Sequence, residues 1–220
     1  MPRLAVIPDL HMRSALLERA RELAEEGYPL LFLGDYGDNG PRPNDPGFLR
    51  EVFALAAERG ATMLVGNHDL AYVYPSEERF RYPGYEPATA AGMAAVFAEY
   101  GGLLRFAHRR GPYLFTHAGV SAALARVLAA RYGVEGVDAV ARFLNVAQPP
   151  ELFYRSPVNG GADPFDGPCW LRLPQYTGAF GDEGVTQVVG HSSQARIRLR
   201  ENLLMVDVGL PLVLEWGGMR

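Results

Sequence analysis

The chain has 220 residues, of which 48% are apolar and 21% are charged, and its formal net charge at pH 7 is −4. This composition is typical of a soluble globular protein with a large core, and the net acidity argues against general nucleic-acid binding, which needs a basic face. A single cysteine, Cys169, excludes an internal disulfide and favours a reducing compartment. The apolar runs are too short to span a bilayer and no signal peptide is visible, so we expect a soluble, cytoplasmic protein.

The first third of the chain alternates between strand-like and helix-like segments. In chain order, the pattern predicts strands at 4–7, 30–33 and 61–65 and helices at 15–26 and 48–59. Ser14 is expected to cap the first helix and Gly27 to end it. The segment 36–46 is interrupted by glycine and proline and is predicted to be a loop. A strand, a helix and a second strand in this order predict a βαβ unit with parallel strands.

The rest of the chain combines strands, helices and two long irregular stretches. The pattern predicts helices at 88–100, 121–132 and 137–145, a hairpin of strands 103–107 and 112–116, and four closing strands at 185–189, 197–199, 203–208 and 212–215. The irregular stretches, near 71–87 and 148–184, are interpreted as insertions that cover a site. We therefore expect an α/β protein with a single domain over residues 1–220.

Polar side chains follow five of the predicted strands. They are, in chain order, Asp9 and His11, Asp35 and Asp38, Asn67 and His68, His117, and His191. Open α/β sheets bind ligands at the carboxyl ends of their strands, so we expect these side chains to converge. Nitrogen and oxygen ligands without sulfur suit manganese, iron or zinc better than calcium or magnesium. Six metal ligands are more than one ion needs and suit two ions that share a carboxylate: Asp9, His11, Asp35, Asn67, His117 and His191.

Such a pair of ions predicts hydrolysis of a phosphoester. The ions would lower the pKa of a bridging water, so that a hydroxide forms near neutral pH and acts as the nucleophile. In an extended segment His68 faces away from Asn67, which makes it a candidate general acid with Asp38 as its orienting carboxylate. Each residue alone also fits a turn, a surface histidine or a packed histidine, but the joint pattern favours the metal site. Asp69 and Asp207 fit either a supporting or a turn role, and His108 is interpreted as a surface residue.

At these residues the sequence resembles the calcineurin-like metallophosphoesterases, and among them the bacterial and phage phosphoprotein-phosphatase branch. The matching motifs are Asp9-Leu10-His11, Gly34-Asp35-Tyr36-Gly37-Asp38, Gly66-Asn67-His68-Asp69, His117-Ala118-Gly119 and Gly190-His191. The resemblance implies a four-layer α/β/β/α sandwich with mixed sheets. It implies that the first ion is held by Asp9 and His11, that Asp35 bridges, and that the second is held by Asn67, His117 and His191. It also implies His68 as the acid with Asp38 as its partner, and Arg172 of Trp170-Leu171-Arg172 as a phosphate-binding residue.

The chain departs from the branch pattern at three positions. Pro8 and Met12 stand where the branch has glycine, which changes backbone freedom but not ligation. Asn39 stands where the branch has a phosphate-binding arginine, whose planar fork is hard to replace. Arg42 is a candidate substitute, and a solvated loop arginine is an equal alternative.

The sequence therefore predicts a metal-dependent phosphatase with two divalent ions, for which manganese is preferred and iron or zinc are alternatives. The expected substrates are phosphorylated small molecules, nucleotides or phosphoproteins, without a stable nucleic-acid or membrane partner. A hydrolase similar to the symmetrical diadenosine tetraphosphate hydrolases is the alternative enzyme, because aromatic residues within 72–85 and Trp170 could stack a base. Core packing is the simpler role for several of these aromatics. A non-catalytic scaffold of the same fold is the alternative of another class, although no ligand of the pattern is lost.

Overall fold

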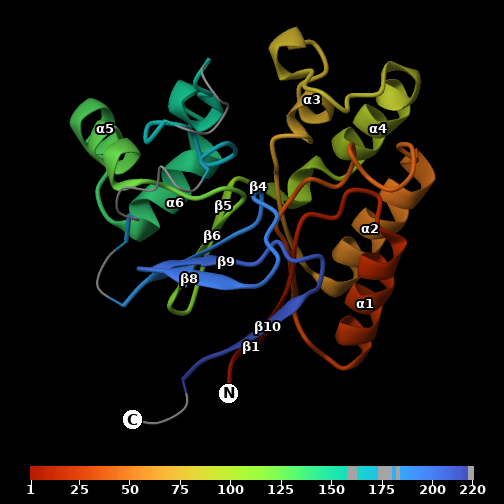
Figure 1. Cartoon of the computed structure of the whole chain (residues 1–220), viewed down its shortest axis with the longest axis horizontal. Coiled ribbons are helices and arrows are strands. Elements are labelled where there is room, and N and C mark those ends of the chain that lie inside the picture. The colour runs from red at the N-terminus through yellow and green to blue at the C-terminus, as the bar shows by residue number, and fades with distance from the viewer. Residues whose placement is uncertain (158–162, 173–179, 182–183, 218–220) are drawn as a thin grey trace. The chain divides into compact units, whose positions relative to one another are not determined.

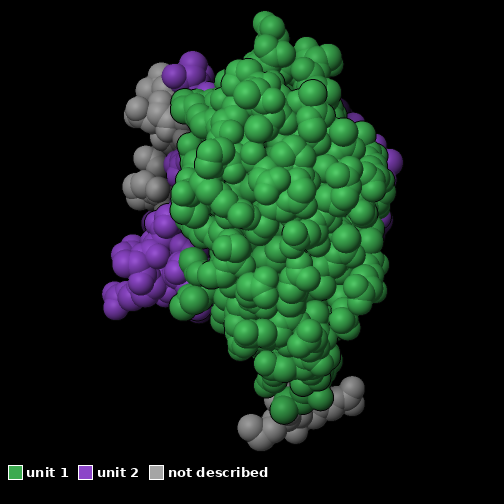
Figure 2. Space-filling view, turned by 90° about the vertical axis from the view of Figure 1, so that its right-hand side faces the viewer, with its two compact units in different colours: residues 1–104, 209–220 green, residues 105–208 purple. Residues whose placement is uncertain are grey.

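A computed structural model describes residues 1–157, 163–172, 180–181 and 184–217. The chain divides into two compact units, which Figure 2 colours green and purple: unit 1 comprises Met1–Leu104 and Gly209–Arg220, and unit 2 comprises Arg105–Val208. There are two five-stranded mixed sheets, one for each unit (Figure 1). The predicted class, an α/β fold with mixed sheets, is confirmed, and two such sheets are consistent with the sandwich fold that the resemblance implies. The single domain over 1–220 stays a prediction.

The sheet of unit 1 presents the ends of three parallel strands at one edge. Its strand order is β10-β1-β2-β3-β4, with β1 at Arg3–Ile7, β2 at Leu30–Phe32, β3 at Thr62–Leu64, β4 at Leu104–Arg105 and β10 at Leu212–Glu215. β1 pairs in parallel with β2, and β2 with β3, as the βαβ pattern predicts, whereas β10 is antiparallel to β1. The polar segments that follow β1, β2 and β3 therefore start from the same edge of the sheet.

The helices of unit 1 pack their apolar faces into one core with the strands. They are α1 (Ser14–Glu25), α2 (Pro46–Arg59), α3 (Leu70–Val73) and α4 (Pro87–Glu99), with 3₁₀ turns η1 (Glu78–Phe80) and η2 (Gly101–Leu103). Leu17, Phe53 and Phe97 bring α1, α2 and α4 into the same cluster as Ile7 and Phe32 of the strands. This packing fixes the end of the sheet from which the loops after β1, β2 and β3 emerge, and these loops carry the metal ligands predicted for unit 1.

The first helix was predicted to be capped by Ser14 and to end at Gly27, and the second of these predictions is confirmed: Gly27, with a φ angle of +80°, directly follows the C-cap residue Glu26. Ser14 was expected to cap α1, but it is the first helical residue, and the N-cap position Arg13 makes no side-chain cap bond. This expectation is wrong because the helix starts one residue earlier than the pattern indicated. In unit 2, by contrast, the Ser121 hydroxyl accepts a hydrogen bond from Leu124 N at 2.9 Å and caps α5.

The sheet of unit 2 also has parallel strands at its centre. Its order is β5-β6-β7-β9-β8, with β5 at Ala107–Arg110, β6 at Tyr113–Thr116, β7 at Thr186–Val189, β9 at Leu203–Met205 and β8 at Arg198–Arg200. The strands β6, β7 and β9 are parallel, and β5 and β8 form antiparallel edges. Three further elements are α5 (Ala122–Tyr132), α6 (Val137–Val146) and η3 (Pro150–Phe153). Within the described residues no helix is both long and apolar enough to cross a bilayer.

The predicted hairpin is correct in kind but wrong in its first strand. The partner of β6 is Ala107–Arg110 rather than 103–107, and Leu104–Arg105 belongs to the other sheet. The chain changes sheet at residue 106 because the side-chain oxygen of Asn145 accepts hydrogen bonds from Phe106 N and Ala107 N, at 2.7 and 3.2 Å. As a result His108 lies half-buried within β5 rather than on the surface. Of the irregular stretch 148–184, residues 158–162, 173–179 and 182–183 lie outside the described residues.

Candidate metal and catalytic site

Two loops of unit 1 bring three possible metal ligands together. Asp9 and His11 follow β1, Asp35 follows β2, and one ligand atom of each lies within 4.8 Å of the others. His11 Nε2 is 3.7 Å from Asp35 Oδ2. Both carboxylates are almost fully buried, and buried carboxylates are costly unless a cation or hydrogen bonds compensate them. This combination of burial, charge and spacing fits a divalent cation.

Backbone carbonyls orient His11 toward this cluster. His11 Nδ1 lies 2.9 Å from the carbonyl oxygen of Gly37 and 2.8 Å from that of Asp38. Both carbonyls can only accept hydrogen bonds, so Nδ1 carries the proton of the neutral ring and Nε2 presents its lone pair toward Asp35. Metal-binding histidines usually hold their second nitrogen in this way. The backbone therefore prepares His11 as a ligand.

Asp69 ties the loop after β2 to the loop after β3. Its Oδ2 accepts hydrogen bonds from Asp35 N and Gly66 N, both at 2.8 Å, and its Oδ1 accepts one from Tyr36 N at 2.9 Å. The side chain is fully buried. Of the two roles that the sequence left open, the structure favours support of the site. The sequence signal was an acidic residue next to Asn67-His68, which does not distinguish this role from a turn.

The loop after β3 also positions the carboxylate of Asp35 directly. His68 N donates a hydrogen bond to Asp35 Oδ1 at 2.9 Å. A Cβ atom on Gly66 would lie only 2.1 Å from the same oxygen. Glycine is therefore required at position 66, because any side chain there would displace Asp35.

The loops that carry the ligands hold strained backbone. In the loops after β1 and β2, five non-glycine residues have positive φ angles of +43° to +56°: His11, Met12, Asp35, Asp38 and Asn39. The left-handed conformation costs roughly 1–2 kcal/mol for an L-residue, so such a group persists only where the surroundings determine it. The hydrogen bonds that Asp35 N and Tyr36 N donate to the Asp69 carboxylate help to hold this backbone conformation. Met12, which stands at a glycine position of the family pattern, keeps a conformation that glycine adopts easily, and its side chain is buried in the core.

His68 and Asp38 lie side by side within unit 1. His68 Nδ1 is 3.3 Å from Asp38 Oδ2. The other carboxylate oxygen of Asp38 accepts hydrogen bonds from the Tyr72 hydroxyl at 2.5 Å and from Asn44 Nδ2 at 2.6 Å. Asn44 Oδ1 in turn accepts from Asp38 N at 2.7 Å. Sequence reasoning missed Asn44, and it placed Tyr72 only within an aromatic insertion, because neither residue lies near Asp38 in a recognisable local pattern.

The pKa values in this group follow from burial and from its hydrogen bonds. Burial lowers the pKa of His68, but the hydrogen bond to Asp38 and the charges of Asp35, Asp38 and Asp69 together raise it above the ordinary value of 6.5. Burial, followed by the hydrogen bond to Asp38, raises the pKa of Tyr72 well above its ordinary value. The Tyr72 hydroxyl therefore stays protonated and donates to Asp38. With Nδ1 held toward Asp38, His68 Nε2 is the nitrogen that can exchange a proton with a substrate.

An open pocket of about 510 Å³ lies next to His68. Asn39 lines it, with Asn39 Nδ2 at 3.2 Å from His68 Nε2, and the other lining residues are Gly40, Pro41, Arg42, Pro43, Gly84, Tyr85 and Glu86. Arg42, the candidate substitute for the missing arginine, donates from Nε to Met12 O at 3.0 Å and stacks on the Phe48 ring at 4.2 Å. These contacts fix Arg42 at the pocket wall, and its binding of phosphate stays a prediction.

Unit 2 places the last two proposed ligands together. His117 follows β6 and His191 follows β7, and His117 Nε2 is 3.2 Å from His191 Nδ1. His191 Nε2 lies 3.1 Å from Trp170 O, a carbonyl that can only accept, so Nε2 carries the proton and Nδ1 is the nitrogen suited to bind a cation. Two nitrogens that each lie about 2.1 Å from one tetrahedral ion are separated by roughly 3.3 Å, close to the observed spacing. The pair therefore fits a shared ion.

The remaining predicted residues occupy different surroundings. Asn67 is buried directly after β3 in unit 1. Asp207 is buried in unit 2, where its carbonyl oxygen accepts a hydrogen bond from Gln194 N at 2.8 Å. Arg172 is exposed, and its Nη1 lies 3.4 Å from His191 O. The structure thus brings Arg172 near one proposed ligand of its own unit, while the residues that follow it, 173–179, lie outside the described part of the chain.

Most of the aromatic residues considered for base stacking are packing residues. Tyr72, Phe80 and Trp170 are between 1% and 4% exposed. Tyr72 stacks on Tyr85 and on Phe97, at centroid distances of 5.6 and 6.1 Å. Their ring faces are therefore used within the protein, which weakens the argument for a nucleotide substrate.

These features define a class of protein: an α/β protein whose buried carboxylates and histidines, set at the ends of parallel strands, suit divalent metal ions. The sequence model of the calcineurin-like phosphoesterase family matches residues 2–200. The chain belongs to this family, and it is a phosphoester hydrolase of a metal-dependent kind. A search among curated proteins finds no match to the sequence.

Several solved structures with similar folds are titled as phosphatases. A cold-active protein-tyrosine phosphatase from a psychrophilic Shewanella species has a TM-score of 0.60 and 18% identity, over 98% of this chain and 76% of that chain. A second structure, of a cold-active protein tyrosine phosphatase, gives a TM-score of 0.64 and 19% identity, over 98% and 74%. A protein serine/threonine phosphatase from Saccharomyces cerevisiae gives 0.50 and 14%, over 93% and 66%. At these identities the similarity concerns the fold.

Proposed function

We propose that the chain is a phosphomonoesterase of the serine/threonine-phosphatase-like branch that uses two divalent transition-metal ions. The observation that carries this proposal is found in unit 1, where Asp9, His11 and Asp35 meet at the sheet edge that also bears the pair His68–Asp38. Ligands for a cation and a proton donor are the two parts that metal-assisted phosphoester cleavage needs.

The proposed ligands are assigned by motif. Asp9 and His11 would hold the first ion, Asp35 would bridge both, and the second ion would be held by Asn67, His117 and His191. The order of the family motifs along the chain and the orientation of the ring nitrogens of His11 and His191 support this assignment. The nitrogen and oxygen ligands favour manganese, with iron or zinc as alternatives. When bound, the two ions would supply Lewis acidity and an activated water as the nucleophile.

The proton for the leaving group is assigned to His68. Asp38 holds Nδ1, so Nε2 is the nitrogen that can donate a proton to the leaving oxygen. Tyr72 and Asn44 hold Asp38 in turn and act as positioning residues. The pocket lined by Asn39 is adjacent to Nε2, and we assign the leaving group to it.

A phosphate monoester is favoured over a dinucleoside polyphosphate because three of the six aromatic residues that could stack a base, Tyr72, Phe80 and Trp170, are buried. The similar solved structures, which are titled as tyrosine and serine/threonine phosphatases, support the same choice at the level of fold. Asn39 in place of the branch arginine leaves the choice between a phosphoprotein and a small phosphorylated molecule to experiment.

The test is hydrolysis of an aryl phosphate by manganese-loaded protein, with metal content measured on the same sample. We expect turnover of the monoester, slower turnover of the diester and of a dinucleoside polyphosphate, and loss of activity with a chelator. His68→Ala should keep its metal and lose rate by about 10²–10⁴-fold, the usual contribution of a general acid. His108→Ala is the matched control, since His108 lies in β5 among Arg105 and Arg110, and it should keep the rate.

Three results would count against the proposal. Protein that holds transition metal but hydrolyses neither monoester nor diester would overturn the activity. Protein that holds no transition metal near neutral pH would favour the scaffold. Unchanged turnover in His68→Ala would remove His68 from the role of acid.

A further inference from the structure

The strand β8 is an edge of the sheet in unit 2. Among the described strands it pairs with β9 alone, in the register Arg198 with Met205, Leu199 with Leu204 and Arg200 with Leu203. Within the described residues no strand lies along its other side. An edge strand exposes backbone N–H and C=O groups that can pair with an added strand.

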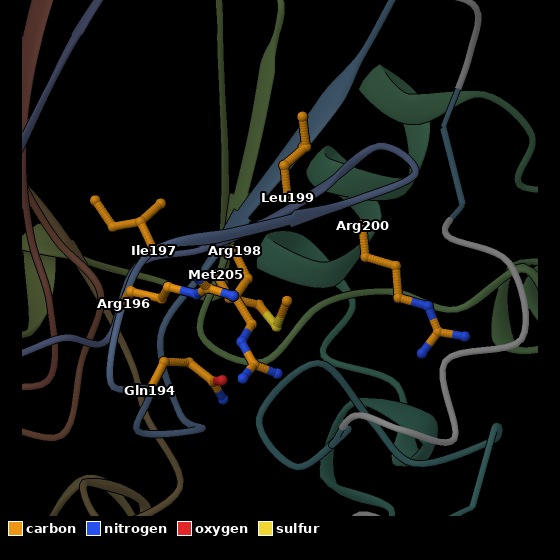
Figure 3. Close-up of a pocket in the computed structure, with 7 residues that line it drawn as sticks. All are labelled: Gln194, Arg196, Ile197, Arg198, Leu199, Arg200 and Met205. Carbon is orange, nitrogen blue, oxygen red and sulfur yellow. The ribbon is translucent and has the colours of Figure 1, made fainter.

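Arginines recur at every second position along this edge. Arg198 and Arg200 belong to β8 and Arg196 lies in the bend just before it, and these arginines alternate with Ile197 and Leu199. In a strand, successive side chains point to opposite sides. Figure 3 shows Ile197 and Leu199 on one side of the strand and Arg198 on the other. Ile197 and Leu199 are 41% and 65% exposed, so the apolar side is open to contact.

The same residues line an open cavity of about 810 Å³. Its wall is completed by Gln194 and Met205, and none of the described residues that line it is acidic (Figure 3). None of the three arginines forms an ion pair within the described part of the chain. In a chain whose net charge is −4, three uncompensated positive charges within five residues form a local site of opposite sign.

We propose that β8 binds an extended acidic segment of a partner protein, which adds to the sheet as a further strand. Backbone hydrogen bonds to the open edge would supply affinity, and alternating side chains would supply specificity. Acidic residues at alternate positions of the partner would face Arg196, Arg198 and Arg200, and apolar residues between them would face Ile197 and Leu199. Opposite charges that face each other across paired strands stabilise the pairing.

The pattern of the edge favours a peptide over a nucleic acid. A nucleic-acid groove needs basic side chains with aromatic platforms for the bases, and no aromatic residue is found among the described residues that line this cavity. Two of the five side chains of residues 196–200 are aliphatic, Ile197 and Leu199, which suits a protein segment with alternating acidic and apolar residues. The proposal is independent of the hydrolytic site, since it uses none of the residues assigned to it.

The test is binding of a labelled peptide, Gly-Glu-Val-Glu-Val-Glu-Gly, to the full chain by fluorescence anisotropy. We expect saturable binding that weakens with added salt, because the contacts are charged. The double substitution Arg198→Glu with Arg200→Glu should weaken binding by about ten-fold or more, which corresponds to about 1.4 kcal/mol. Arg126→Glu with Arg142→Glu, on the exposed sides of α5 and α6, changes the net charge equally and should leave binding within about two-fold.

A methylated peptide separates strand addition from simple charge attraction, and an oligonucleotide tests the kind of partner. A peptide of the same composition whose alternate backbone nitrogens are methylated keeps every charge but loses donors, and it should bind at least about ten-fold more weakly. Equal binding of the methylated peptide would overturn strand addition, and equal binding to the Arg198/Arg200 double variant would overturn the site. Tighter binding of a single-stranded oligonucleotide through the same arginines would replace the peptide with a nucleic acid. Aryl phosphate hydrolysis by the double variant should be unchanged, which distinguishes this site from the hydrolytic one.

Discussion

The carboxylate of Asp69 offers the most direct test of how the ligand loops are held. It is fully buried and accepts three backbone hydrogen bonds, from Asp35 N and Gly66 N at 2.8 Å and from Tyr36 N at 2.9 Å. Asp69→Asn keeps the shape of the side chain but leaves only one oxygen that can accept these hydrogen bonds. If that oxygen keeps the bonds to residues 35 and 66, the new amide group faces Tyr36 N, and that donor loses its acceptor.

The magnitude follows from these contacts. A buried donor left without an acceptor costs about 1–3 kcal/mol, and loss of charge assistance weakens each of the other two hydrogen bonds by about 0.5–1.5 kcal/mol. We therefore expect Asp69→Asn to lower the free energy of unfolding by roughly 2–6 kcal/mol, a large share of the roughly 5–15 kcal/mol of a typical domain. The metal-binding loops should also become less ordered, so affinity for added manganese should fall.

The assay is urea unfolding of chelator-treated protein, followed by circular dichroism, with a separate manganese titration. Asp45→Asn is the matched control: Asp45 is exposed, caps α2 by accepting from Gly47 N at 2.8 Å, and asparagine caps helices as well as aspartate does. It should change stability by less than about 0.5 kcal/mol. If Asp69→Asn also costs less than about 1 kcal/mol, the carboxylate does not hold the loops and the reasoning is refuted.

Three further predictions concern single contacts. Tyr72→Phe removes the hydroxyl that donates to Asp38 at 2.5 Å. It should lower kcat by about ten-fold with little change in KM, since Tyr72 would act through Asp38 rather than on substrate. An equal loss in a His68→Ala background would show that Tyr72 and His68 do not act together. Ser121→Ala should cost about 1 kcal/mol of stability, whereas Ser14→Ala should cost almost nothing, because only Ser121 caps its helix; equal effects in thermal unfolding would contradict this. Burial, then Arg110 and Arg105, lowers the pKa of His108, so the unfolded chain takes up this proton first and stability falls as pH drops through about 6.5. His108→Gln should therefore lose less stability than the parent between about pH 7.5 and 5.5, and an equal loss would exclude His108 as the cause.

Sequence alone was sufficient for the parts of this protein that depend on local pattern. The runs before Asp9, Asp35 and Asn67 predicted β1, β2 and β3 to within a residue or two, because continuous apolar segments of this length are buried in parallel sheets. Polar residues at the ends of such strands then predicted where ligands gather. The family motifs identified the chemistry at the level that the family model confirms.

The tertiary structure decided what depends on contacts between distant segments. Asn44 and Tyr72 are 28 residues apart, and their hydrogen bonds to Asp38 depend on how the loop after β2 and the helix α3 pack, which no local pattern encodes. The role of Asp69 was likewise undecided until the backbone N–H groups of two loops were placed around it. The misplaced first strand of the predicted hairpin has the same origin. The side chain of Asn145, 39 residues away from Phe106, decides where the chain leaves one sheet for the other. Periodicity describes which face of an element is buried, whereas hydrogen bonds between loops are set only when the elements are packed together.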